Sequence, residues 1–204
     1  HGFTAEKVVA DKHPSYISAK IRKPQKTVQH HMAHSASVIA EHQLQGDVLC
    51  FAFDGTGYGD DGAIWGSEVF LFDGQIFHRC AHLDYTKMPA SDAVAKDADL
   101  CLACYMGTNP LIEKAKEANI NMIENSSMGR LFDAVAALLD ICHQNTYEGE
   151  CAEKLEAAAA HAAAPCTFTP SLSPVQILNE IQNTSAPVCD KALGFHQMPV
   201  SYTH

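Results

Sequence analysis

Four histidines lie within fifteen residues of this sequence, in the stretch VQHHMAHSASVIAEH at 28–42. His30 and His34 are four positions apart, so on a helix both imidazoles lie on one face and can bind one ion. His42 lies eight residues beyond His34, roughly 12 Å further along a helix axis, and cannot share that ion. His31 points to another side. The spacing leaves two alternatives, a metal site at His30 and His34 or a solvated imidazole cluster.

The glycine-rich stretch DGTGYGDDG at 54–62 is the second place where chemistry is expected. Its glycines allow backbone N–H groups to approach a phosphate closely. Asp54 opens the stretch at the end of the apolar run DVLCFAF, where a metal-binding or catalytic carboxylate is displayed. The stretch lacks the lysine of a Walker A loop, and a strand follows it where a dinucleotide-binding fingerprint needs a helix. It suits the phosphate hairpin of actin-type and sugar-kinase-type ATPases, and a plain β-turn is the alternative.

The elements around these residues predict an α/β chain. Short strands are expected in KVVADK and KTVQHH, with a turn at His13–Pro14 and a short helix at 18–22 between them. A helical pattern follows at 32–44. Residues 47–83 predict an antiparallel meander of three strands with the glycine-rich loop between the first two. Helices are then expected within 91–107, 109–120, 126–142, 147–163 and 173–184.

Composition narrows the class of protein. The 204 residues are 47% hydrophobic, enough for one sizeable core or two small lobes. The net charge of −10 argues against a nucleic-acid partner. No apolar run approaches the roughly 18–20 residues that span a bilayer, and no signal peptide is recognisable, so a cytoplasmic chain without a membrane partner is expected. The eight cysteines are expected to be mostly buried thiols, and Cys101-x-x-Cys104 is interpreted as helix packing.

Five stretches carry a family resemblance: HPSYISAKI, VQHHMAHSASVIAEH, FDGTGYGDDGAIWGSEVFLFDG, SSMGRLFDAVAALL and YEGECAEKLEAAA. In this order and spacing they resemble the C-terminal, threonylcarbamoyl-transferase-like domain of HypF carbamoyltransferases, the maturation factors of nickel–iron hydrogenases. The resemblance covers about residues 6–196. It implies a partial actin-like ATPase fold of the ASKHA type, with the end of the first lobe at 1–46 and an incomplete second lobe at 47–204.

The resemblance also implies a reaction. HypF-type enzymes make carbamoyl-adenylate from carbamoyl phosphate and ATP, and pass the carbamoyl group to the C-terminal cysteine of HypE. The nucleophile then belongs to the partner, and no catalytic residue is assigned here. The cofactor is a divalent metal, iron or zinc. By position, the implied metal ligands are His30, His34 and Asp54. The implied phosphate and nucleotide residues are Gly55, Thr56, Gly57, Gly59, Asp133 and Glu148. His31 and His42 are expected to take no part.

The sequence departs from the family pattern in three places. Met32 stands where the family commonly has a further histidine, and Pro89–Asp92 reads Pro-Ala-Ser-Asp where the family has Pro-Gly-Gly-Asp. A Gly-Gly-x-Phe-x-Asn segment and a further metal-binding aspartate are not found, which predicts a truncated piece. Two alternative functions stay open. One is a tRNA threonylcarbamoyl transferase, although that family has Ser-Gly-Gly-His at the hairpin. The other is an inactive binding fragment.

Overall fold

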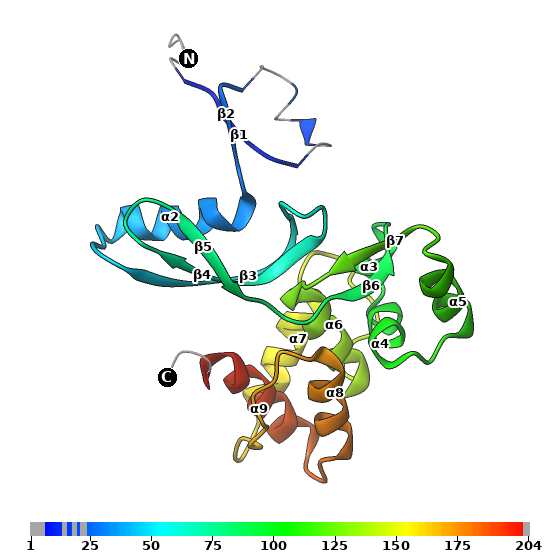
Figure 1. Cartoon of the computed structure of the whole chain (residues 1–204). Helices are drawn as coiled ribbons and strands as arrows, with labels where there is room; N and C mark the ends of the chain where they lie inside the picture. Colours follow the sequence, from blue (N-terminus) through cyan, green and yellow to red (C-terminus); the bar gives the residue numbers. More distant parts are fainter. Residues whose placement is uncertain (1–6, 14–15, 18–19, 21–23, 202–204) are drawn as a thin grey trace.

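The N-terminal segment forms a small sheet that leads into the histidine helix. The computed structural model describes residues 7–13, 16–17, 20 and 24–201. Strand β1 (Val9–Asp11) pairs in parallel with β2 (Lys26–Val28), and helix α2 (His30–Glu41) follows at once. The two predicted strands and the helix are therefore confirmed, whereas the short helix expected at 18–22 lies largely outside the described residues. Figure 1 shows α2 lying along the neighbouring sheet.

The predicted meander is confirmed as β3 (Val48–Tyr58), β4 (Ile64–Phe72) and β5 (Phe77–Ala81), which pair antiparallel in sequence order. The expectation of a glycine-rich loop between the first two strands is wrong in its extent. Strand β3 continues through most of the glycine-rich stretch, and the chain turns at Gly59–Ala63, where the Gly59 N–H donates to the Ala63 carbonyl at 2.9 Å. Of the three glycines at 55, 57 and 59, Gly57 is paired across the ladder, with Trp65 of β4.

Two further strands were not expected from the sequence. Strands β6 (Thr86–Pro89) and β7 (Met122–Asn125) pair antiparallel, and β7 joins the start of β4 in parallel through Ile64 and Asn125. Each is four residues long, too short for a periodic signal, and β6 ends in a proline. They extend the sheet to the order β3-β4-β7-β6, with β5 also on β4.

The helical half differs from expectation at two places. The helix predicted within 91–107 is two helices, because Asp97 is extended (φ −116°, ψ 102°) and its carboxylate caps the second helix at Leu100 N. The last helix, α9, was not expected, since Gly194 and Pro199 are poor helix formers. The helices are α3 (Ala93–Lys96), α4 (Ala98–Met106), α5 (Pro110–Ala118), α6 (Met128–Leu138), α7 (Glu150–Ala159), α8 (Pro174–Asn183) and α9 (Val188–Ser201).

Two apolar cores hold these elements. The larger one joins helices α4 and α6 to α9, which cluster below the sheet in Figure 1, and it includes Cys101 and Cys104 as predicted. The smaller one lies between α2 and the meander and is centred on Trp65 and Phe70. All eight cysteines are free thiols, and five of them are buried. Within the described residues, no helix combines the length and the apolar composition needed to cross a membrane.

Candidate metal and nucleotide site

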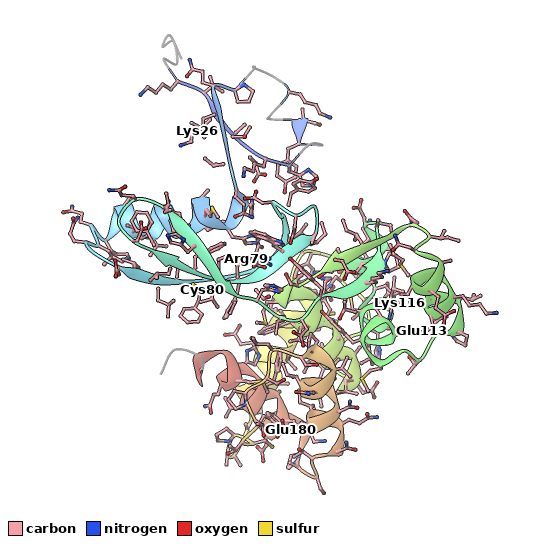
Figure 2. The ribbon with its side chains drawn as sticks, in the orientation of Figure 1. Lys26, Arg79, Cys80, Glu113, Lys116 and Glu180 are labelled. Carbon is pink, nitrogen blue, oxygen red and sulfur yellow. The ribbon has the colours of Figure 1, made fainter. Side chains whose placement is uncertain are left out.

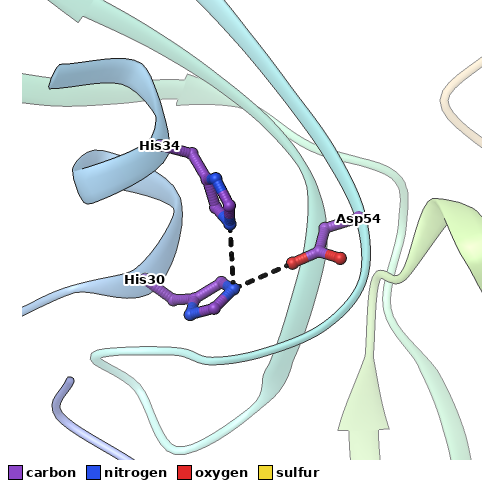
Figure 3. Close-up of side chains that lie close together, drawn as sticks. All are labelled: His30, His34 and Asp54. Atoms are coloured by element: carbon purple, nitrogen blue, oxygen red, sulfur yellow. Dashed lines mark hydrogen bonds and ion pairs between the residues drawn. The ribbon is translucent and has the colours of Figure 1, made fainter. Parts of the chain in front are cut away.

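His30, His34 and Asp54 converge at the first turns of α2. The Nε2 atom of His30 lies 3.1 Å from His34 Nε2 and 3.1 Å from Asp54 Oδ2 (Figure 3). One potential ligand atom from each residue lies within 4.8 Å of the other two. Gln29 starts the helix by accepting the Met32 N–H at 2.9 Å, which sets the rotation that turns His30 and His34 toward the sheet.

The alternation of side chains along β3 puts Asp54 on the same face as the two histidines, and an irregularity in the β3–β4 ladder follows it. Along β3, Cys50 and Ala52 are buried against α2, and strand alternation puts Asp54 on the same face. The ladder with β4 then breaks, since Phe53 pairs with Ser67 but the next registered pair is Gly57 with Trp65. The backbone at 54–56 therefore leaves the regular ladder, as bulges do beside binding sites.

Asp11 completes the surroundings of His30, and the sequence analysis did not single it out. Its Oδ2 lies 2.6 Å from His30 Nδ1, so that nitrogen carries the proton and donates it to Asp11. The lone pair on Nε2 then faces Asp54 Oδ2 at 3.1 Å, and two acceptors at this distance repel unless a proton or a cation lies between them. Two imidazoles and a carboxylate thus fit a divalent iron or zinc ion. No sequence pattern near His30 indicates Asp11, because β1 and α2 come together only in the folded protein.

His31, which was expected to take no part in the site, is fully buried beneath these groups. Its Nε2 atom is 3.6 Å from Asp54 Oδ2. Burial lowers the pKa of His31, and the neighbouring Asp54 carboxylate opposes that effect. His42, by contrast, is the C-cap residue at the far end of α2.

Gly57 and Gly59 serve close packing within the protein. A Cβ atom at Gly57 would lie 2.2 Å from His31 Cε1, and one at Gly59 would lie 2.2 Å from Trp65 Nε1. Both positions therefore exclude a side chain because aromatic rings already press against the backbone. The two residues lie away from the cavity that Gly55 and Thr56 line.

That cavity has a volume of about 560 Å³ and lies on the other side of the bulge. It brings together four of the residues expected at the nucleotide: Gly55, Thr56, Asp133 and Glu148. Asp92 also lines it, at the end of the segment where the family pattern has two glycines. Met32, at the other departure from the pattern, packs partly buried in the smaller core.

Asp133 is held inside the cavity wall, with 2% of its surface exposed. Its Oδ2 pairs with Arg130 Nε at 2.9 Å and its Oδ1 accepts from Asn145 Nδ2 at 2.9 Å. Burial raises the pKa of Asp133, and the Arg130 charge opposes that effect. Arg130 and Lys96 are cations that line the cavity and that the sequence analysis did not select. Arg130 was recognisable only as one of several basic residues on predicted helices.

The start of α6 fixes the backbone that lies between the histidine cluster and the cavity. Ser127 Oγ donates to the Gly55 carbonyl at 2.7 Å and accepts the Arg130 N–H at 3.2 Å. Gly129 lies so close to Gly55 that an added Cβ would be 2.8 Å from its Cα atom. Asp54 and Gly55 are neighbours in the chain, so the histidine cluster and the cavity share one stretch of fixed backbone.

Comparison with known proteins places this arrangement in a family. A profile described as the second subdomain of the carbamoyltransferase Kae1-like domain of HypF matches residues 50–198, and one described as the HypF Kae1-like domain matches residues 1–41. The chain is 35% identical to carbamoyltransferase HypF2 of Cupriavidus necator over 161 residues, 71% of this chain and 20% of that protein. It is 31% identical to a probable carbamoyltransferase HypF of Methanocaldococcus jannaschii over 206 residues, which cover 87% of this chain and 26% of that protein.

Solved structures agree with the sequence relatives. A full-length HypF crystallised in a phosphate- and nucleotide-bound form superposes with a TM-score of 0.86 at 33% identity, over 97% of this chain and 36% of that one. HypF of T. kodakarensis superposes with a TM-score of 0.80 at 30% identity, over 93% of this chain and 30% of that one. The predicted partial actin-like α/β fold is thereby confirmed. The chain belongs to the HypF carbamoyltransferase family, within its C-terminal Kae1-like domain.

Proposed function

We propose that this chain carries the carbamoyl-transfer site of a HypF-type hydrogenase maturation factor. The reaction makes carbamoyl-adenylate from carbamoyl phosphate and ATP, and the acceptor is the C-terminal cysteine thiolate of a HypE-type protein. The chain spans about a fifth to a quarter of the first curated relatives it matches, so the activity of a whole HypF is proposed for the protein to which this chain contributes. We also propose the division into lobes at 46/47 and a cytoplasmic location.

The observation that carries the proposal is the junction at Asp54 and Gly55. Asp54 faces His30 and His34 on one side, while Gly55 and Thr56 line the 560 Å³ cavity on the other. A metal and a nucleotide bound at these two places would share β3 as their common wall. A carbamoyl-adenylate would suit these two places. Its nucleoside would lie in the cavity, and the oxygens of its phosphate and carbamoyl groups would lie toward the metal.

Each part of the site has a role in this proposal. Gly55 and Thr56 line the place proposed for the phosphate, where glycine leaves room for close approach, and Arg130 supplies a positive charge from the first turn of α6. Glu148 and Asp133, which line the same cavity, would accept hydrogen bonds from the nucleoside. A divalent ion at His30, His34 and Asp54 would stabilise negative charge on substrate oxygens. The acceptor thiolate comes from the partner, so the eight cysteines are not required.

The test is carbamoyl transfer measured with two acceptors in parallel. Full-length protein containing this chain would be given ATP, labelled carbamoyl phosphate and a HypE-type protein, and in parallel labelled threonylcarbamoyl-adenylate and tRNA. Label on the HypE-type cysteine, lost when that cysteine is changed to serine, supports the proposal. Label on tRNA favours the threonylcarbamoyl-transferase alternative, and label on neither acceptor favours the binding-fragment alternative.

A further inference from the structure

His31 is held by a hydrogen-bond network that determines which of its nitrogens carries the proton. The Gln29 side chain accepts the Met32 N–H through Oε1 at 2.9 Å, which fixes the orientation of its amide. The amide nitrogen of Gln29 then lies 3.1 Å from His31 Nδ1 and donates to the Tyr58 carbonyl at 3.3 Å. An amide nitrogen can only donate, so Nδ1 of His31 accepts.

The proton of neutral His31 therefore lies on Nε2. This atom is buried and has no hydrogen-bond partner at ordinary distance among the described residues. A buried N–H without an acceptor costs about 1–3 kcal/mol, so a nearby acceptor is expected. The carboxylate of Asp54 lies in that direction, with Oδ2 at 3.6 Å. The same oxygen faces His30 Nε2, so His31 acts on the carboxylate oxygen that points into the metal cluster.

Packing prevents the His31 ring from turning away. Gly57 gives it room on the strand side, where an added Cβ would lie within 3.0 Å of three ring atoms. Trp65 lies nearly parallel to it, with ring centroids 6.4 Å apart. Trp65 is itself fixed, because its Nε1 donates to Asp61 at 2.9 Å and the Arg79 guanidinium lies 3.8 Å above its ring. Arg79, labelled in Figure 2, lies on β5.

We propose that His31 is a positioning residue for the metal site: its Nε2–H holds the Asp54 carboxylate in place, and Gln29 keeps the proton on that nitrogen. This inference rests on the proposed metal site at His30, His34 and Asp54. It assigns a role to His31, which lies between His30 and His34 in the sequence, is fully buried and is not a candidate metal ligand.

Binding of Co²⁺ as a spectroscopic probe tests this role without reference to activity. His31→Phe keeps a ring of similar size but removes the donor, and we expect a 10- to 100-fold weaker Co²⁺ affinity with altered visible absorption. His31→Gln returns an N–H donor and is expected to recover most of the affinity and the wild-type spectrum. His42→Phe, at the far end of the same helix, is the matched control and should change neither.

A further variant tests the tautomer. Gln29→Ser keeps a hydroxyl that can cap the Met32 N–H but is too short to donate to His31 Nδ1, so nothing holds the His31 proton on Nε2. We expect weaker Co²⁺ binding than in the wild type, measured at a temperature where circular dichroism shows each variant folded.

Several outcomes would overturn the inference. One is wild-type affinity and spectrum in folded His31→Phe. Another is a His31→Gln variant that binds Co²⁺ no better than His31→Phe, since volume and not the donor would then matter. If His31→Phe does not fold, wild-type binding by Gln29→Ser would refute the role of the tautomer. Failure of the wild-type chain to bind Co²⁺ would instead refute the proposed metal site itself, which separates the two failures.

Discussion

The two regions that meet at β3 are built in different ways. The histidine cluster is partly open to solvent, with side-chain exposures of 24% for His30 and 30% for Asp54, and it lies on a layer that includes buried polar groups such as His31 and Glu68. The cavity wall contains the ion pair of Arg130 and Asp133, whose side chains are 11% and 3% exposed, beside the apolar core that the helices share.

This difference separates binding from stability. The candidate metal ligands are partly exposed and contribute little to the apolar cores. Changing one of them should therefore lower metal affinity more than it lowers the free energy of unfolding. A largely buried charged pair has the opposite balance, because removing one partner leaves the charge of the other without its counter-ion. Four predictions follow this contrast, from the largest expected effect to the smallest.

The buried pair should show the largest effect on stability. Asp133→Leu leaves the Arg130 guanidinium without its carboxylate, and we expect a loss of about 3–5 kcal/mol in the free energy of unfolding. Denaturant unfolding measures it. The control is Glu113→Gln on α5, which breaks the Glu113–Lys116 pair with the same i, i+3 spacing at the surface (Figure 2) and should cost less than about 1 kcal/mol. Equal losses in the two variants would contradict the contrast.

Removing a metal ligand should have a large effect on binding and a small one on folding. His34→Ala is expected to reduce Zn²⁺ or Fe²⁺ affinity by about 100-fold or more, since ligands matter at least as much as their supporting partners. Metal content after dialysis and the thermal midpoint are measured together. His42→Ala should retain the metal. Metal retained in His34→Ala would refute the two-histidine site.

The carboxylate behind His30 should matter less than a ligand. Asp11→Ala removes the group that fixes the His30 proton on Nδ1, and we expect about a 10-fold weaker metal affinity. Isothermal titration with Zn²⁺ measures the change. Lys12→Ala is the control, because it breaks only the neighbouring exposed pair with Asp60 and should leave metal affinity unchanged. An effect of the same size in both variants would point to general loosening of β1.

The smallest effect is expected at His143, which lies in the exposed segment after α6. His143 bridges Asp99 and Asp140 at 2.8 and 2.9 Å, and these carboxylates raise its pKa. A raised pKa in the folded state stabilises the protein fully below the unfolded pKa of about 6.5, and this stabilisation disappears as the pH rises through the folded value. Since the group is well exposed, the gain is a few tenths of a kcal/mol. His143→Gln should therefore lower the thermal midpoint at about pH 5.5 and not at about pH 9. A larger loss at the higher pH would show the opposite linkage.

Much of the fold could be predicted because its signals are local. The meander follows from alternating and continuous apolar runs, and α6 from an apolar stripe with Ser127 at its start. Strands β6 and β7 could not be predicted, since four residues carry no period and their pairing depends on segments far apart in the chain. The break at Asp97 was missed because one residue served as both the end of α3 and the cap of α4.

The sequence by itself determined the family, the spacing of His30 and His34, and the place of Asp54 at the end of an apolar run. These features depend on residues close together in the chain, and the regular geometry of a helix or strand determines where their side chains lie. Only the tertiary structure decided what surrounds them: Asp11 behind His30, His31 beneath Asp54, and Arg130 beside Gly55. Burial and the pairing of polar groups come from contacts between distant segments, so no local pattern marks these residues.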